Sequence, residues 1–332
     1  MKNKIFSIVI FILLFFVLDR VIGGFLETPK KILIRDMKYD PYWRWKEFYE
    51  QPANSLDLIL LGSSHCYRNF DPKIFNEHIK LNTMNMGSSV QTPLTSYYVL
   101  QEILRNQTPG YVIMELYWVS LEGGKEFENA NYNFENMHWS ANKLEFFMHA
   151  FPVEDSGRVF LKSFHYKNNF ENTIRHLRGK DISWATGDYY GGRGYLANRN
   201  VATTEGLQKT NQFKGVSFDA GKIPLRNVQY LEKVIELCKA RGIKLVFVTA
   251  PLPPTSLAMV KNYSEAHEFF MAIAQKHGIT YMDYNMPEYQ MDLADTDFKD
   301  DDHLNVVGVE KFDLNLIGRL LELGIGPKDG KN

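Results

Sequence analysis

Cysteine is nearly absent from this sequence, which has only Cys66 and Cys238 among 332 residues. Two thiols exclude a disulfide-dense scaffold and a cysteine-rich zinc module, although a single bridge between them stays possible. An excess of charge of one sign is lacking as well, since 38 basic residues stand against 39 acidic ones and leave a formal net charge of −1. We therefore expect no nucleic-acid partner, because such a partner requires a basic surface.

Internal repeats and charge runs are also lacking, and the composition is that of a folded chain. Hydrophobic residues make up 45% and aromatic residues 14%, which supplies a sizeable core. The length favours a single large domain with an insertion. The glycine cluster Gly191-Gly192-Arg193-Gly194 does not have G-x-G-x-x-G spacing between a strand and a helix, so it is no dinucleotide site. No cofactor is predicted.

Long apolar runs are missing except at the N-terminus, where one extends from Ile5 to Leu18. Asp19 and Arg20 interrupt it before Val21–Leu26. The uninterrupted part spans roughly 21 Å as a helix, which is short of the ~30 Å hydrocarbon core unless Val21–Leu26 also enters it. We predict an uncleaved membrane anchor over residues 1–27. A cleaved signal peptide and a buried helix of a cytosolic protein are the alternatives.

The orientation of this anchor follows from the lysines that precede it. Lys2 and Lys4 would stay cytoplasmic by the positive-inside rule, which predicts a single-pass protein with an extracytoplasmic domain. The basic residues Lys30, Lys31 and Arg35 on the other side weaken this prediction.

Residues 28–55 are predicted to form a stem, because they are too aromatic for a solvated spacer. The rings could lie at the lipid interface or pack against the domain, which we favour. They belong to Tyr42, Trp43, Trp45, Phe48 and Tyr49.

Short apolar runs alternate with helical stretches from Leu56 onward and predict a domain over residues 56–326. Five runs are typical of buried parallel strands: Leu56–Leu61, Thr83–Met86, Tyr111–Leu116, Lys244–Thr249 and Ile279–Tyr284. Apolar residues three and four apart predict helices over 228–238 and 309–323, closed by Gly242 and Gly324. This alternation predicts an α/β three-layer sandwich, with helices on both faces of a parallel sheet.

Residues 119–222 break this alternation and are predicted to be an insertion. The segment is rich in Asn, Gly and aromatic residues, with a possible helix near Ala141–His149. It follows a strand at its carboxyl end, where open α/β sheets bind ligands. We therefore expect the insertion to contribute to specificity.

Residues suited to catalysis gather at two places far apart in the sequence. Gly62-Ser63-Ser64-His65 follows the first predicted strand, and Ser64 is the candidate nucleophile. A serine hydroxyl needs an adjacent base. Asp300 and His303 precede the last helix, where the carboxylate could hold one ring nitrogen while the other faces Ser64. We predict that these stretches meet at one rim of the sheet.

Plainer interpretations of both motifs stay open. A Gly-Ser-Ser sequence after a strand often only starts a helix, and Asp301, Asp302 or Asn305 could cap the final helix. The aspartates at 300–302 could instead bind a divalent metal, because carboxylates suit hard cations. The sequence displays no further ligands for such an ion, and we predict no metal site.

At these motifs the chain resembles the SGNH/GDSL hydrolase superfamily. The resemblance is carried by Leu60-Leu61-Gly62-Ser63-Ser64-His65, Asn85-Met86-Gly87-Ser88 and Asp300-x-x-His303. It covers residues 56–324 when the insertion is allowed, and it implies a flavodoxin-like parallel sheet. The chain is most similar to membrane-anchored, extracytoplasmic members, including the D-alanine transfer protein of teichoic acid synthesis and the O-acetyltransferase partners of alginate export.

The resemblance implies roles for individual residues. Ser64 would be the nucleophile, His303 the base and Asp300 the residue that orients the base. The backbone amides of Ser64 and Gly87 would contribute to an oxyanion hole.

One motif of the superfamily is missing. Gly-x-Asn-Asp should follow the third strand, which here ends in Glu115-Leu116-Tyr117-Trp118. Losing one oxyanion donor typically costs about 10² to 10³ in rate. Gln91 is a candidate substitute. Glu115 is expected to hydrogen-bond a neighbouring loop or the substrate, and His65 to line the pocket wall, because adjacent helical side chains point about 100° apart.

Together these observations predict a membrane-anchored serine esterase or O-acyltransferase. A sugar or polyol hydroxyl, or water, would resolve the acyl-serine. Anchoring favours a cell-surface or lipid-linked glycan as substrate, and analogy suggests an integral membrane acyltransferase as a partner. Two other classes stay open: a glycan-binding or scaffold protein with weak or no turnover, and a metal-dependent phosphoesterase.

Overall fold

The computed structural model describes residues 2–37, 40–123, 126–180 and 187–327. The chain forms two units: unit 1 contains Met1–Tyr39 and Phe151–Thr186, and unit 2 contains Asp40–Ala150 and Gly187–Asn332. This division differs from the predicted one, because both the stem and the insertion are shared between the units. Each unit is therefore described by itself.

A five-stranded parallel sheet forms the centre of unit 2. Its strands are β1 (Leu58–Leu61), β2 (Thr83–Asn85), β3 (Tyr111–Glu115), β6 (Lys244–Thr249) and β7 (Thr280–Asp283), in the spatial order β2-β1-β3-β6-β7. Each lies within one of the predicted apolar runs. Counted along the chain this is the order 2-1-3-4-5 of flavodoxin-like sheets, so the predicted fold class is confirmed.

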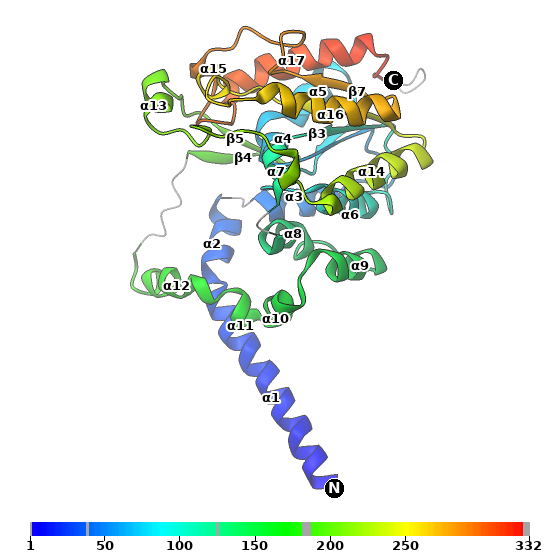
Figure 1. The fold of residues 1–332 in the computed structure, drawn as a ribbon. Helices are drawn as coiled ribbons and strands as arrows, with labels where there is room; N and C mark the ends of the chain where they lie inside the picture. Colours follow the sequence, from blue (N-terminus) through cyan, green and yellow to red (C-terminus); the bar gives the residue numbers. More distant parts are fainter. Residues whose placement is uncertain (1, 38–39, 124–125, 181–186, 328–332) are drawn as a thin grey trace. The chain divides into compact units, whose positions relative to one another are not determined.

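Helices cover both faces of the sheet (Figure 1). One layer contains α4 (Ser64–Asn69), α5 (Pro72–His78) and α17 (Val306–Glu322); the other contains α6 (Pro93–Ile103), α14 (Leu225–Ala240) and α16 (Tyr263–His277). All four residues of β1 are buried, because its alternate side chains enter the two opposite layers.

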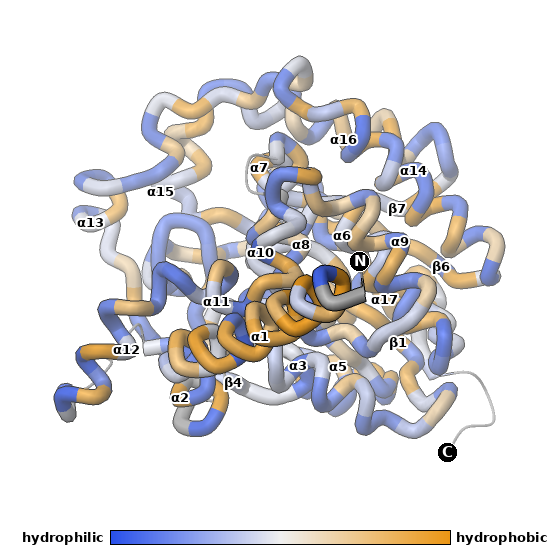
Figure 2. The backbone as a smooth tube through the Cα atoms, turned by 90° about the horizontal axis from the view of Figure 1, so that it is seen from below, coloured by the Kyte–Doolittle hydropathy of each residue, from blue (hydrophilic) through white to orange (hydrophobic). Residues whose placement is uncertain are grey.

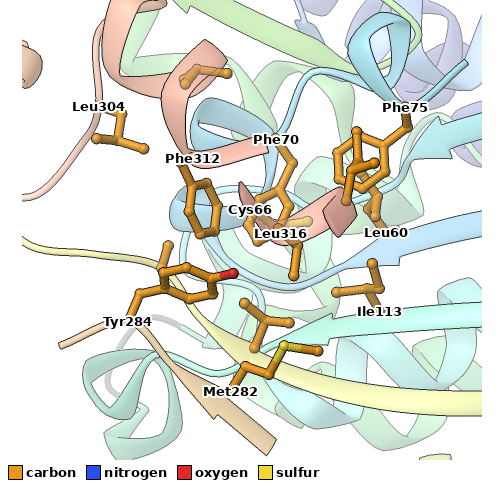
Figure 3. Close-up of a cluster of buried hydrophobic side chains, with 14 of the residues drawn as sticks. Leu60, Cys66, Phe70, Phe75, Ile113, Met282, Tyr284, Leu304, Phe312 and Leu316 are labelled. Atoms are coloured by element: carbon orange, nitrogen blue, oxygen red, sulfur yellow. The ribbon is translucent and has the colours of Figure 1, made fainter. Parts of the chain in front are cut away.

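The core beside α4 and α17 positions the predicted catalytic residues (Figure 3). Phe70 follows α4 and packs edge-on against Phe312 of α17, with ring centroids 5.1 Å apart. Cys66 of α4 and Leu304, just before α17, belong to the same buried cluster. The helices that begin near Ser64 and His303 therefore share one face of the sheet. Cys66 and Cys238 are both free and buried, so no disulfide joins them.

The remaining elements of unit 2 surround this sandwich. They are α3 (Asp40–Tyr49), α7 (Trp118–Glu122), α8 (Glu126–Phe134), α9 (Ala141–Ala150), α13 (Thr204–Lys209), α15 (Pro254–Leu257), the antiparallel pair β4 (Asp188–Gly192) and β5 (Tyr195–Asn198), and short 3-10 turns at Ala220–Lys222 and Asp295–Asp297. The glycine cluster at residues 191–194 forms the end of β4 and the turn of this hairpin. Gly194 has φ +88, and a Cβ there would lie 1.9 Å from the Asn85 carbonyl oxygen, so the turn requires glycine.

Helix α3 buries part of the aromatic stem in unit 2. Trp45 and Phe48 are 1% and 2% exposed, and the Trp45 indole N–H donates to Asn133 of α8 (3.1 Å). Packing against the domain is confirmed for these two rings.

Unit 1 is entirely helical in its described residues. It contains α1 (Lys2–Leu26), α2 (Thr28–Met37), α10 (Ser156–Phe160), α11 (Lys162–His165), α12 (Phe170–Leu177) and 3-10 turns at Val153–Asp155 and Lys167–Asn169. Apolar residues follow α1 along most of its length (Figure 2). Residues Lys4–Leu26, with a mean hydropathy of 2.7, are long and apolar enough to cross a membrane, a criterion that a signal sequence also meets.

Candidate active site

A sharp turn from β1 into α4 presents the two candidate serines. Gly62 has φ +148, and a Cβ at this position would lie 2.6 Å from Oε2 of Glu115. Only glycine therefore fits between the end of β1 and the carboxylate at the end of β3. The turn places Ser63 at the N-cap of α4 and Ser64 at its first helical position.

The hydrogen bonds of this turn distinguish Ser63 from Ser64. The Ser63 hydroxyl donates to Oε2 of Glu115 (2.8 Å) and accepts from the N–H of His65 (3.2 Å), and Ser63 is 1% exposed. Ser64 is partly exposed, and no side chain in the described part of the chain hydrogen-bonds its hydroxyl. Ser63 is therefore committed to capping, whereas Ser64 is available as a nucleophile.

The loop that carries Asp300 and His303 packs against α4. The N–H of Leu304 donates to Oδ1 of Asn69, the last residue of α4 (3.0 Å). The rings of His65 and His303 lie with their centroids 5.2 Å apart. The structure thus brings the start of α4 and the loop before α17 together. The hydrogen bond between Leu304 and Asn69 joins residues 235 positions apart.

His303 is held by carboxylates at one ring nitrogen. Its Nδ1 lies 2.6 Å from Oδ1 of Asp302 and 3.1 Å from Oδ1 of Asp300. Its Nε2 is buried, with no hydrogen-bond partner among the described residues. Two carboxylates at Nδ1 place the proton there, so Nε2 is the nitrogen that can accept a proton.

Asp302 is a second carboxylate at the His303 ring that the sequence alone did not identify, beside Asp300, whose Oδ1 and Oδ2 accept from Nδ1 (3.1 and 3.2 Å). It was considered only as a helix cap or a metal ligand, yet its carboxylate is closer to His303 than that of Asp300 is. The cap of α17 is Asn305, which accepts from the N–H groups of Val307 and Gly308. Three consecutive aspartates before a histidine give no signal for which one reaches the ring, because that depends on how the turn closes.

Charges in the loop shift the protonation of all three groups. Burial lowers the pKa of the His303 imidazole, but Asp302 and Asp300 outweigh burial and raise that pKa above 6.5. Burial raises the pKa of Asp302, but the imidazoles of His303 and His65 outweigh it and hold that pKa well below its usual value. For Asp300 the effect of His303 likewise outweighs burial and lowers the pKa. The two carboxylates therefore stabilise the protonated form of the His303 imidazole relative to a histidine in water.

His65 and Glu115 are buried, which differs from the substrate contact predicted for them. His65 is 0% exposed, stacks on Tyr117 with ring centroids 3.9 Å apart, and places Nε2 3.5 Å from Oδ2 of Asp302. Glu115 is 3% exposed and accepts two hydrogen bonds from Ser63. Contact with a neighbouring loop was one of the two expectations for Glu115, and it is the one observed. Both side chains support the site from beneath.

The predicted oxyanion donors are only partly in place. The N–H of Gly87 donates to Oδ1 of Asn85 (3.0 Å) and is therefore occupied. Gln91 is 2% exposed, and its amide group bonds to the hydroxyls of Ser88 and Ser96. Both predictions are corrected by these contacts. Of the three groups, the N–H of Ser64 alone has no partner in the described part of the chain.

A shallow cleft of about 470 Å³ opens beside Asp300. Asp300 and Asp301 line one part of it, and Thr203, Thr210 and Gln212 line another. The latter three residues belong to the predicted insertion, so part of that segment borders the candidate site.

The acidic side chains near this cleft are engaged by protein donors. Asp300 pairs with Lys299 and His303, and Asp301 accepts from the backbone N–H of Gln212 (2.8 Å). Asp302 lies against His303 and His65. Ion pairs and hydrogen bonds therefore hold these carboxylates in place, and the ligand atoms of His65, Asp302 and His303 lie close enough together to hold a cation.

No protein-family model and no curated protein matches the chain. Solved structures are similar in fold at low identity. A protein assigned as an acylhydrolase from Bacteroides fragilis is 14% identical, with a TM-score of 0.39 over 83% of this chain and 94% of that chain. A protein of the G-D-S-L family from Desulfitobacterium hafniense, assigned as lipolytic, is 12% identical, with a TM-score of 0.39 over 80% and 99% of the two chains. A GDSL-like lipase from Bacteroides thetaiotaomicron is 13% identical, with a TM-score of 0.39 over 84% and 97%. This similarity concerns the fold, and the roles assigned to individual residues rest on the geometry described above.

Proposed function

We propose that this chain is a serine esterase or O-acyltransferase that works through an acyl intermediate on Ser64. One observation carries the proposal: carboxylates hold His303 at Nδ1, while Nε2 has no partner in the described part of the chain. The loop that carries this ring packs against the helix that begins at Ser64. An imidazole held at one nitrogen and uncommitted at the other is the arrangement that a general base requires.

In the first half-reaction, the Ser64 hydroxyl oxygen attacks the carbonyl carbon of an ester or thioester. Nε2 of His303 accepts the hydroxyl proton, and the N–H of Ser64 faces the developing oxyanion. Collapse of the tetrahedral intermediate breaks the bond to the leaving group, which takes the proton from His303. In the second half, an acceptor hydroxyl or water gives a proton to His303 and attacks the acyl carbon. The bond between this carbon and the Ser64 oxygen then breaks, and His303 returns the proton to that oxygen.

The acceptor in this proposal is a hydroxyl-rich molecule, namely a cell-surface or lipid-linked glycan. Support comes from the hydroxyl and amide side chains of Thr203, Thr210 and Gln212 in the cleft beside Asp300. The apolar helix α1 supports single-pass anchoring, and Lys2 and Lys4 before it support a place for unit 2 outside the cytoplasm. An integral membrane acyltransferase that supplies the acyl group is the expected partner in such an arrangement.

A fluorophosphonate probe and an acetyl ester test this proposal with a matched pair of serines. Ser64→Ala should abolish probe labelling and lower ester turnover by at least about 10³-fold, because the nucleophile is lost. Ser63→Ala should keep the labelled serine and lose mainly stability. Equal labelling of Ser64→Ala and the native protein would remove Ser64 from the proposed role.

A second candidate function is a glycan-binding or scaffold protein with little turnover. The occupied N–H of Gly87 and the absence of an asparagine after β3 favour it, because both remove oxyanion stabilisation. The same ester assay separates the two candidates. A binding protein should give no Ser64-dependent rate.

A further inference from the structure

In unit 1, helix α1 supports the middle of the insertion. Asp19 lies within the apolar stretch of α1 and is only 4% exposed. Its carboxylate accepts hydrogen bonds from the N–H of Lys162 (3.0 Å), the N–H of Ser163 (2.9 Å) and the hydroxyl of Ser163 (2.6 Å). These bonds satisfy the first amides of α11. The charge that interrupts the apolar run therefore has a structural partner within the same unit.

Further contacts fix the same arrangement. A Cβ on Gly23 would lie 2.5 Å from Cβ of Lys162, so α11 approaches the backbone of α1 closely. The Lys162 ammonium pairs with Glu27 (2.7 Å), and the Arg20 guanidinium donates to the Phe160 carbonyl (3.1 Å). Helices α10, α11 and α12 lie beside the C-terminal half of α1 (Figure 1). Cleavage after α1 would remove all these partners.

Helix α12 has one apolar side along its length. Phe170, Ile174 and Leu177 follow the spacing i, i+4, i+7, which places them on one face. Phe170 and Leu177 are 59% and 63% exposed. Two further exposed apolar side chains, Val153 and Phe164, come from the turns and helices just before α12. Large apolar side chains that stay exposed in series mark a binding surface.

The same segment is basic. Residues 151–180 contain six Lys or Arg against three Asp or Glu, a net charge of +3. Lys167, Arg175 and Arg178 are exposed, and the Lys167 ammonium lies 4.1 Å from the centroid of the Phe164 ring. Exposed apolar side chains interleaved with cations, next to a helix long enough to span a bilayer, match an anionic lipid surface.

We propose that residues 151–178 form an interfacial collar, which lies in the headgroup layer of an anionic membrane around a permanently retained α1. The collar inserts Phe164, Phe170 and Leu177 among the upper acyl chains, and its cations contact lipid phosphates. This inference rests on the anchoring part of the proposed function and is independent of the chemistry at Ser64.

Fluorescent labels on the two faces of α12 test the collar in the full-length protein. Phe170→Cys and its neighbour Glu171→Cys are each labelled with an environment-sensitive dye, since Cys66 and Cys238 are each 1% exposed. The protein is placed in nanodiscs of phosphatidylglycerol or phosphatidylcholine that contain lipids spin-labelled near the headgroup. We expect quenching of the dye at 170 to exceed that at 171 several-fold in the anionic nanodiscs, and to weaken in the neutral ones.

A charge-reversed protein provides the control. Arg175→Glu with Arg178→Glu should remove the difference between anionic and neutral lipids while leaving probe labelling of Ser64 unchanged in detergent. Equal lipid quenching at 170 and 171, with both dyes reached by an aqueous quencher, would overturn the collar and assign the face to a protein partner. A mature membrane protein without an N-terminal peptide that begins at Met1 would overturn retention of α1. A failure of Ser64 chemistry would show instead as loss of probe labelling, with lipid quenching intact.

Discussion

Two buried carboxylates, one in each unit, hold together segments that are far apart in the sequence. In unit 1, Asp19 accepts hydrogen bonds from backbone N–H groups of α11. In unit 2, Asp302 lies against the imidazoles of His303 and His65. Backbone amides are uncharged and do not titrate between about pH 5 and pH 8, whereas an imidazole can gain or lose a proton in this range. The same residue type therefore provides a fixed structural contact in one unit and a titratable site in the other.

The largest expected effect is loss of the carboxylate at 302. Asp302→Ala should lower kcat/KM for an acetyl ester by about 10³-fold, because the imidazole loses the partner that fixes its tautomer and stabilises its protonated form. Asp302 is 8% exposed, so little water is available to replace it. The measurement is steady-state turnover of the purified full-length protein.

Asp300→Ala is the matched control for this variant. The Asp300 carboxylate is farther from Nδ1 of His303 than that of Asp302, at 3.1 Å against 2.6 Å. The side chain of Asp300 is also more exposed, at 34% against 11% for the side chain of Asp302. Its loss should therefore cost less activity than the loss of Asp302. A larger loss for Asp300→Ala would assign the orienting role to Asp300, whose two carboxylate oxygens accept from Nδ1, as the sequence predicts.

The next prediction concerns pH, which separates the titratable contact from the fixed one. Burial lowers the pKa of His303, but Asp302 and Asp300 raise it above 6.5 in sum. A protonated imidazole cannot accept the serine proton, so kcat/KM should fall about tenfold per pH unit below this pKa and level off above it. Asp302→Asn removes one negative charge and should move the midpoint to lower pH.

Rate profiles from about pH 5 to about pH 9 of the native protein and Asp302→Asn check this prediction. The direction of the change is its sharpest part, because the loss of a negative charge can only make the imidazolium less stable. A midpoint that stays in place or rises in the variant would separate Asp302 from the titration of His303.

The sheet of unit 2 could be predicted from the sequence because local signals suffice for it. Buried strands of a parallel sheet are continuous apolar runs, and β6 begins and ends at the residues predicted. The turn at Gly62-Ser63-Ser64 also has a local cause, since glycine and a capping serine are needed there. The packing of the His303 loop against the helix that begins at Ser64 follows from topology, because both lie next to helices of one layer.

Tertiary contacts decide what the sequence could not predict. Which of Asp300 and Asp302 approaches His303 depends on the closure of one turn. The commitment of the Gly87 amide depends on Asn85, whose side chain turns inward to accept from it. The association of residues 151–180 with α1 has only one signal in the sequence, a carboxylate inside an apolar run. The partner of this carboxylate at the Lys162 N–H lies 143 positions away.

Loss of the Asp19 contact in unit 1 should have a smaller effect, which is limited to stability and leaves the chemistry at Ser64 unchanged. Asp19→Ala removes the acceptor for three hydrogen bonds and should destabilise the packing of α11 on α1 by about 1 to 2 kcal/mol. In the full-length protein in detergent, tryptic cleavage at Arg158 and Lys167 should rise at least about fivefold. Asp19→Asn keeps one acceptor oxygen, so its cleavage rate should lie between those of the native protein and Asp19→Ala. Labelling of Ser64 should match the native protein in both variants, in contrast to Asp302→Ala, and a loss of labelling would show that the two contacts are not independent.

The smallest expected effect comes from variants of Asn305. They test whether the position of the His303 loop, apart from its charged groups, matters for the pKa of His303. The side-chain Oδ1 of Asn305 accepts from the N–H groups of Val307 and Gly308, while its Nδ2 donates to the carbonyls of Thr296 (2.8 Å) and Phe298 (3.3 Å). Asn305→Ala should lower the free energy of unfolding by about 1 kcal/mol through loss of the cap. Asn305→Asp keeps the cap and loses both donations, so it reports on the bonds that tie the loop to residues 296 and 298. The urea midpoints of both variants measure the two contributions. The pH midpoint of kcat/KM should stay unchanged in Asn305→Ala, because the carboxylates at Nδ1 set the pKa of His303 and no charge is removed; a shifted midpoint would show that loop position controls the pKa as strongly as Asp302 does.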